Sequence, residues 1–422
     1  MKKFLALILC LSFILPFSAC SSTDLEAPVN TEQAAGSIET KDNEETKKEE
    51  KSVTVPDPLT WDKINAIPIA TADMTEDQLR QICADYFRLQ LTYQWTPSES
   101  FRYEIEAYNR MVDMKKGTVY VGSPYDGGRG NLYKIMNYYD PETGVLTTSK
   151  NGEHTTDLIG NHCTSASHWG WSRVSNTIHF GLTGSVTEAN GAIKLGPYKY
   201  ENEGKEHKST RDVCNANGEQ VMFQSYAKLK LADGVINFNG AGHVMMVSKA
   251  AEVKYLEDGS IDGKNSYVLV LEQVSSWKQT DFNGKSLPQQ GNVDKKYTFS
   301  DLFKASYLPF TIKELIGTDP VEKSVVTLDY TEPTATPDAL KAAKITSNYE
   351  ISDVTVRVFA PDGKEAYKYI TNCNWGEFEL NLNNSIFPAT LSSFAKKGEH
   401  KIKIDCRIGT GELITVYSGE LV

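Results

Sequence analysis

The sequence predicts an α+β protein: a first part that combines helices with antiparallel strands, followed by an all-β unit. Three patterns predict this class. Apolar residues recur at helical spacing after Thr75, apolar β-branched runs lie at 243–247 and 267–271, and alternating apolar residues fill much of 338–422. At 422 residues, 40% of them hydrophobic and 23% charged, the chain has an ordinary globular composition with room for two or three domains.

The N-terminus predicts export. Two lysines precede an apolar run over residues 4–17, which is shorter than the roughly 20 residues of a membrane-spanning helix. The next residues complete Phe-Ser-Ala-Cys at 17–20, which resembles the bacterial lipobox. We therefore expect a signal peptide over 1–19, lipidation of Cys20, and a polar, flexible tether over 20–56. The mature chain is expected outside the cytoplasm, anchored to the cell membrane through that lipid; the alternative is a plain signal peptide without lipid.

Net charge and cysteine content limit the partners and the disulfides that can be expected. The net charge of −11, without a dense basic cluster, argues against a nucleic-acid partner. Of seven cysteines, Cys10 leaves with the signal peptide and Cys20 takes lipid. An odd number remains, so at least one thiol is expected to be unpaired, in the set Cys83, Cys163, Cys214, Cys373 and Cys406. Cys373 and Cys406 are candidates for a disulfide.

The elements follow in order. Thr75 and Gln78 have the spacing of a capping box, which predicts a helix of about four turns in an N-terminal helical segment, 57–118, packed on the main domain. That domain is expected over 119–320. A Thr/Pro-rich connection follows, and the alternating runs over 338–422 predict a small β-sandwich of immunoglobulin type.

One constellation of residues suggests chemistry. Cys163 follows a Gly-Asn loop and precedes small residues that can begin a helix, a position that favours the thiolate. His243 begins an apolar strand and supplies a candidate base. Glu272 and Gln273 follow the next strand, and because strand side chains alternate, only one of them can face the histidine ring.

Together these residues resemble the NlpC-type cell-wall peptidases, papain-like cysteine enzymes related to the CHAP amidases. The segment Gly-Ser-Pro-Tyr ending at Tyr125 is similar to the family's Gly-x-Pro-Tyr. The resemblance covers about residues 119–275. It implies a papain-like domain, in which the helix that carries the cysteine packs on an antiparallel sheet that carries the histidine. It makes Cys163 the nucleophile and His243 the base and then the acid. Glu272, or alternatively Gln273, would orient the histidine, and Tyr125 would position the thiolate or bind the oxyanion.

The resemblance departs from the family at two neighbours of the cysteine. His162 stands where the family usually has Asp, and Thr164 where it usually has Ser. The implied activity is hydrolysis of a peptide or amide bond in peptidoglycan, with no metal or organic cofactor and with a monomer expected. The alternative is a catalytically inactive wall-binding or adhesion lipoprotein. Zinc bound by His162, Cys163 and His168 is disfavoured, because the spacing fits no common ligand pattern.

Overall fold

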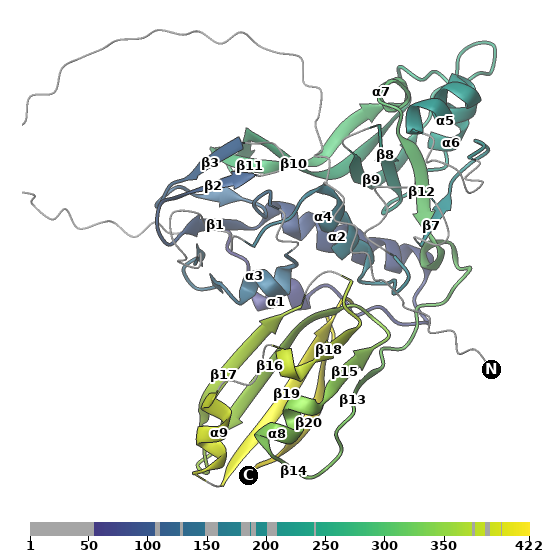
Figure 1. Ribbon diagram of the computed structural model, residues 1–422. Helices are drawn as coiled ribbons and strands as arrows, with labels where there is room; N and C mark the ends of the chain where they lie inside the picture. Colours follow the sequence, from purple (N-terminus) through teal and green to yellow (C-terminus); the bar gives the residue numbers. More distant parts are fainter. Residues whose placement is uncertain are drawn as a thin grey trace, which may run out of the picture.

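The computed structural model describes residues 55–105, 110–126, 130–147, 159–178, 186, 191–200, 209–239, 242–373, 376–384, 389–397 and 399–422. The predicted signal peptide, Cys20 and nearly all of the predicted tether lie outside these residues. The class is α+β, as predicted, with several sheets and few helices (Figure 1). Among the described helices, none combines the length and apolar character needed to cross a membrane.

The first unit is built on one large sheet. Within the described residues, ten strands run in the order β5-β6-β1-β4-β11-β10-β9-β8-β12-β7. Their bounds are β1 Gln94–Pro97, β4 Tyr120–Val121, β5 Tyr139–Asp140, β6 Val145–Leu146, β7 Ala192–Lys194, β8 Gly234–Asn237, β9 His243–Glu252, β10 Tyr267–Phe282, β11 Lys285–Thr298 and β12 Leu308–Ile312. Strands β8 to β11 pair antiparallel, so the two predicted apolar runs become the neighbouring central strands β9 and β10.

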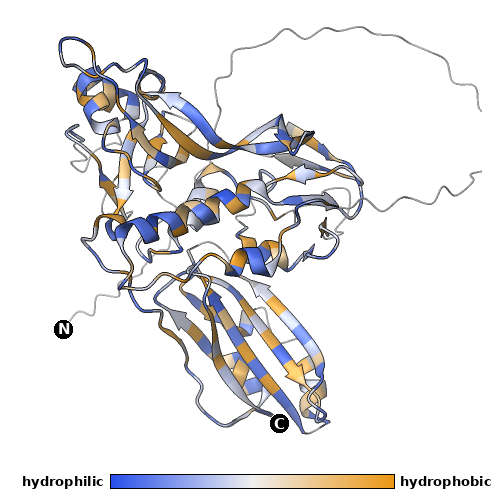
Figure 2. Cartoon of the chain, turned by 180° about the vertical axis from the view of Figure 1, so that it is seen from behind, coloured by the Kyte–Doolittle hydropathy of each residue, from blue (hydrophilic) through white to orange (hydrophobic). Residues whose placement is uncertain are grey.

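Helices cover this sheet. Helix α2, Glu76–Thr92, begins with the predicted capping box, in which Thr75 and Gln78 exchange hydrogen bonds. It lies against the cysteine-bearing helix α4, Cys163–Trp171, and its outer face is largely hydrophilic (Figure 2). The other helical segments are α1 Trp61–Asn65, α3 Leu132–Met136, α5 Thr210–Asn217, α6 Glu219–Tyr226, α7 Phe299–Lys304 and the 3-10 turn η4 Lys313–Ile316.

The N-terminal segment 57–118 is not only helical. It supplies β1 to the large sheet and forms a separate hairpin of β2, Phe101–Ile105, with β3, Arg110–Met114. Its buried side chains belong to the same hydrophobic core as the strands of the main sheet. The segment is therefore part of the first unit rather than a helical addition to it.

The second unit contains two sheets around a core of its own. One sheet has the order β13-β15-β18 and the other β14-β20-β19-β16-β17. Hydrophobic and hydrophilic residues alternate along several of these strands (Figure 2). The bounds are β13 Val326–Leu328, β14 Thr334–Ala335, α8 Pro337–Ala342, β15 Lys344–Ser347, β16 Ile351–Phe359, β17 Glu365–Asn372, β18 Glu379–Asn381, η5 Leu382–Asn384, α9 Ala389–Ala395, β19 His400–Ile408 and β20 Leu413–Leu421.

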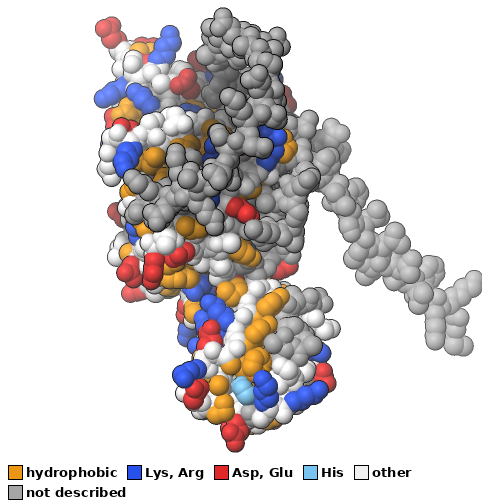
Figure 3. Space-filling model, turned by 90° about the vertical axis from the view of Figure 1, so that its left-hand side faces the viewer, with side chains coloured by type: hydrophobic (Ala, Val, Ile, Leu, Met, Phe, Trp, Pro, Cys, Tyr) orange, Lys and Arg blue, Asp and Glu red, His pale blue; other side chains and the backbone are white. Residues whose placement is uncertain are grey.

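This unit begins earlier than predicted. Strands β13 and β14 precede residue 338 and already pair with β15 and β20. Such short strands are held by backbone hydrogen bonds and need no alternating apolar pattern, so the sequence did not reveal them. On the face in Figure 3, a strip of hydrophobic side chains runs along this unit, and Lys and Arg are interspersed with Asp and Glu.

Buried polar contacts join the two units. The Asn131 Nδ2 donates to Ser352 Oγ at 2.7 Å, and the Lys134 Nζ donates to the Cys373 carbonyl at 2.5 Å. The Arg407 guanidinium stacks over the ring of Tyr133 with its carbon 4.5 Å from the centroid. In Figure 1 the second unit lies directly beneath α1 and α3, in agreement with these contacts.

The cysteines correct one expectation. All five cysteines of the described residues are buried free thiols, so the candidate Cys373–Cys406 disulfide is not formed. The backbone N–H of Cys373 bonds to the Ser352 carbonyl from one side of β16, and Cys406 pairs with Val354 from the other side. A whole strand therefore separates the two residues. Cys163 and Cys214 are not paired either.

Candidate active site

Helix α4 begins at the predicted nucleophile. Its N-cap is His162, whose Nδ1 accepts from the Ser165 backbone N–H at 3.3 Å, while Ser165 Oγ accepts from the His162 N–H at 3.0 Å. Cys163 is the first helical residue and is 1% exposed. The positive end of the helix dipole therefore lies at the thiol, where it favours a negative charge.

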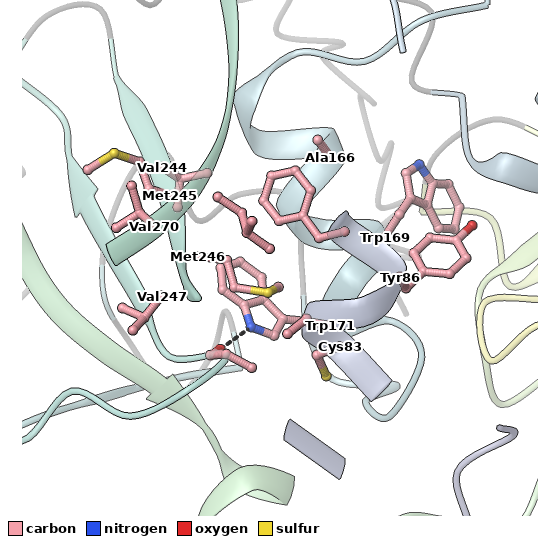
Figure 4. Packing of buried hydrophobic residues seen from close by; sticks show 14 of the residues in the cluster. Cys83, Tyr86, Ala166, Trp169, Trp171, Val244, Met245, Met246, Val247 and Val270 are labelled. Carbon is pink, nitrogen blue, oxygen red and sulfur yellow. Dashed lines mark hydrogen bonds between the residues drawn. The ribbon is translucent and has the colours of Figure 1, made fainter. Parts of the chain in front are cut away.

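The rest of α4 anchors this helix start in the core. Trp169 and Trp171 are buried, and the Trp171 indole N–H donates to the Ala232 carbonyl at 2.8 Å (Figure 4). A Cβ on Gly170 would lie 2.8 Å from the Met246 Cε, which is the end of a flexible side chain, and 3.2 Å from the Cys83 carbonyl oxygen of α2, so glycine favours the close packing of α4 at this point. The helix is thus fixed between α2 and the central strands that carry the other predicted site residues.

Those strands bring the histidine and one carboxylate to Cys163. The His243 ring, at the start of β9, donates from Nε2 to Glu272 Oε2 at 3.0 Å, and it also shares a hydrogen bond with the Cys163 side chain. Because Nε2 is taken by Glu272, Nδ1 is the ring nitrogen that remains for the thiol. The three predicted residues therefore form one hydrogen-bonded series in the order Cys163, His243, Glu272.

The hydrogen bonds and charges of Cys163 and Glu272 favour the protonated, charged form of the His243 imidazole. Burial opposes the imidazolium, but the hydrogen bonds and charges of Cys163 and Glu272 outweigh it and raise the pKa of His243. By the same coupling, the imidazolium favours the thiolate form of Cys163. Burial raises the pKa of the other thiols, to about 12 for Cys214 and Cys373. Cys163 thus differs from these thiols in having an imidazolium beside it.

Strand β11 completes the surroundings of Glu272. Its Oε1 accepts from the Asn292 Nδ2 at 2.5 Å and from the Lys295 Nζ at 2.9 Å, and the Tyr297 hydroxyl lies 3.3 Å from Oε2. Burial opposes the carboxylate, but the hydrogen bond and charge of His243, with those of Lys295, lower the pKa of Glu272 to about 2. Sequence reasoning missed the β11 residues, because they form no motif and only the pairing of β10 with β11 places them there.

Gln273 faces away from the histidine. Its Nε2 donates to the carbonyls of Ser123 at 2.8 Å and Gln290 at 2.7 Å. The structure therefore puts Glu272, and not Gln273, in contact with His243. Gln273 instead holds the segment before Tyr125 against the sheet.

Tyr125 lies beside the nucleophile loop through its backbone. It forms a parallel bridge with Asn161, two residues before the cysteine, and its N–H donates to Gln290 Oε1 at 2.9 Å. Its side chain is buried. The role predicted for Tyr125 in positioning the thiolate or binding the oxyanion stays a prediction.

The histidines near Cys163 have structural partners. His162 caps α4, and the His168 Nε2 lies 2.6 Å from Glu350 Oε2, a buried carboxylate of the second unit. Across the described ranges, no cluster of three or more His, Cys, Asp or Glu side chains has a geometry suited to a metal ion.

Comparison with known proteins does not assign the chain to a family. No family model, curated protein or solved structure matches the chain. The functional interpretation therefore depends on the arrangement of Cys163, His243 and Glu272 and on the sequence patterns that predicted it.

Proposed function

We propose that this protein is an extracytoplasmic cysteine hydrolase that cleaves a peptide or amide bond in peptidoglycan. One observation carries the proposal: a cysteine at a helix N-terminus shares a hydrogen bond with a histidine that a buried carboxylate orients. This is the arrangement needed to activate a thiol as a nucleophile. No metal or organic cofactor is required for the reaction.

Each residue has a defined step. The Cys163 thiolate attacks the carbonyl carbon of the scissile amide, and the His243 imidazolium then gives its proton to the leaving amine as the C–N bond breaks. The resulting thioester is attacked by water, from which His243 takes a proton. Loss of the thiolate releases the carboxylic acid. Glu272 is a positioning residue that keeps His243 Nδ1 directed at the sulfur.

The resemblance to NlpC-type peptidases supports the wall as substrate. The Cys-bearing helix α4 lies on the antiparallel strands that carry His243 and Glu272, which is the order expected for a papain-like domain. The departure at His162 has a physical explanation, because its ring accepts the N-cap hydrogen bond that an Asp side chain commonly accepts. The predicted export signal and lipobox support a site of action outside the cytoplasm, with the membrane as the other partner.

The finer identity of the second unit belongs to the same proposal. Two facing sheets with a common core and alternating strands support an immunoglobulin-like sandwich. Its buried contacts with α3 and α4 support a role in holding the catalytic unit together. We propose that it supports the site directly, whether or not it also touches the wall.

Mass spectrometry of soluble fragments tests the activity. The exported full chain is purified and incubated with peptidoglycan under reducing conditions, beside the variants Cys163→Ala and Cys214→Ala. Cys214 is the matched control because it is an equally buried thiol outside the site. We expect new termini from the wild type and from C214A, and none from C163A. Absence of fragments with every protein and several wall types would contradict the proposal and favour the inactive wall-binding lipoprotein.

A further inference from the structure

Two lysines lie at the Glu272 end of the site. The Lys295 Nζ is 2.9 Å from Glu272 Oε1 and forms an ion pair with it. The Lys278 Nζ contacts Asn292 Oδ1, and the Nδ2 of the same Asn292 donates to Glu272 Oε1. The Asn292 side chain thus connects Lys278 to Glu272, and through Glu272 to His243 and Cys163.

The charges of this cluster do not cancel. The Cys163 thiolate is balanced by the His243 imidazolium, and Glu272 is balanced by Lys295. Lys278 carries a further positive charge, and no Asp or Glu in the described part of the chain forms an ion pair with it. The charged groups acting on Lys278 are Glu272 and the like-charged Lys295.

The backbone directs Lys278 to this place. The pairing of β10 with β11 is regular up to Gln273 opposite Gly291, and it resumes with Lys278 opposite Gln289. Four residues of β10 therefore stand opposite one residue of β11. Such bulges re-aim side chains and are common beside active sites. Lys278 is half-buried, and burial lowers its pKa, so its unpaired charge is held at a cost that an anion would relieve.

We propose that Lys278, with Lys295 beside it, binds a carboxylate of the substrate at the Glu272 end of the site, on the side of His243 away from the Cys163 thiol. The substrate class is then a peptide with a free carboxylate at some distance from the cleaved bond, and the same peptide with that carboxylate amidated is a poorer substrate. This inference rests on the proposed hydrolase function for the identity of the reaction. The expectation that the bound group is an anion depends only on the charge balance of the site.

Alkylation of Cys163 tests, without a substrate, whether the site favours an anion. The full chain is treated with iodoacetate, which is anionic, and with iodoacetamide, which is neutral and of similar size, and labelling of Cys163 is followed by mass spectrometry at low salt. We expect Lys278→Gln to lower the iodoacetate-to-iodoacetamide rate ratio by about three- to tenfold, as for one unit charge removed nearby. Lys278→Arg should retain the wild-type ratio.

Lys296→Gln is the matched control, because Lys296 is an exposed neighbour on β11 whose ammonium lies over the Tyr267 ring. A ratio that falls equally in K296Q and K278Q, or in neither, overturns the inference. If neither reagent labels Cys163, the thiol is not reactive, and the hydrolase proposal is overturned as well.

Hydrolysis separates the two proposals further. Paired wall peptides, with the carboxylate free or amidated, are compared for the wild type and K278Q. We expect the wild type to show a lower KM for the free carboxylate and K278Q to lose that preference with little change in kcat. Equal KM values in the wild type would refute the carboxylate site and leave the hydrolase standing. Hydrolysis of neither peptide would contradict the hydrolase, and the alkylation ratio would still decide the charge at the site.

Discussion

Replacing Glu272 with glutamine removes one charge from the site and keeps a side chain of the same shape. The carboxyl has a pKa of about 2 in the folded protein against an ordinary value of 4.5. A group with a lowered folded-state pKa stabilises the fold above its unfolded pKa, and this contribution is lost as the pH falls toward the folded value. The shift corresponds to about 3 kcal/mol at pH 7 and about 1 kcal/mol at pH 3.

Urea unfolding at these two pH values provides the assay. We expect the difference in unfolding free energy between the wild type and E272Q to shrink by about 2 kcal/mol from pH 7 to pH 3, because over that range the carboxyl takes up its proton in the unfolded chain while it stays largely ionised in the folded protein. Glu257→Gln, in an exposed turn, is the control and should show no such change. A destabilisation by E272Q that is equal at both pH values would refute the assignment of the buried ion pair.

Three further substitutions test the supports of the site. Gln273→Met leaves two buried carbonyls without their donor and should cost about 2 to 4 kcal/mol in urea unfolding; a changed pH profile of Cys163 alkylation would instead mean that Gln273 acts on the histidine. His168→Ala removes the partner of the buried Glu350 Oε2, while Oε1 still accepts from the Gly376 N–H, and should cost about 2 kcal/mol in urea unfolding; a loss below about 1 kcal/mol would show that the pair contributes little. Gly160→Ala places a Cβ 2.3 Å from the Pro124 carbonyl oxygen, so it should slow alkylation of Cys163 by iodoacetamide as the nucleophile loop shifts; an unchanged rate would contradict this.

Local patterns predicted the elements that position the site. The capping box at Thr75 marked the start of α2, and the apolar runs marked β9 and β10. These predictions succeeded because each depends on neighbours within a few residues. Cys163 and His243 could also be named from local sequence, because Cys163 precedes a run of small residues that can begin a helix and His243 begins an apolar strand.

The choice between Glu272 and Gln273 could not be made from the sequence. Both side chains are fully buried, so burial does not separate them, and a register shift after Val270 disturbs the simple alternation of β10. The supporting residues on β11 escaped prediction for a related reason. Their contact with Glu272 depends on which strands pair and in what register, and strand pairing is a long-range property.

The short strands and the free state of Cys373 and Cys406 were not predicted, for other physical reasons. Strands β1, β13 and β14 are two to four residues long, too short for a period of two to be recognised. The odd number of cysteines predicted at least one unpaired thiol, and Cys373 and Cys406 were candidates for a disulfide in the exported β-sandwich. In the folded chain Cys83, Cys214, Cys373 and Cys406 instead fill space in the two cores as small apolar groups.

The pairing of His168 with Glu350 also sets an order of events during synthesis. The two residues are 182 positions apart, yet His168 lies on the helix that begins with Cys163. Helix α4 therefore gains this buried partner only after residue 350 has emerged and the second unit has folded onto the first. Cys163 is made early, but the buried pair that joins its helix to the second unit can form only after nearly the whole polypeptide has been made.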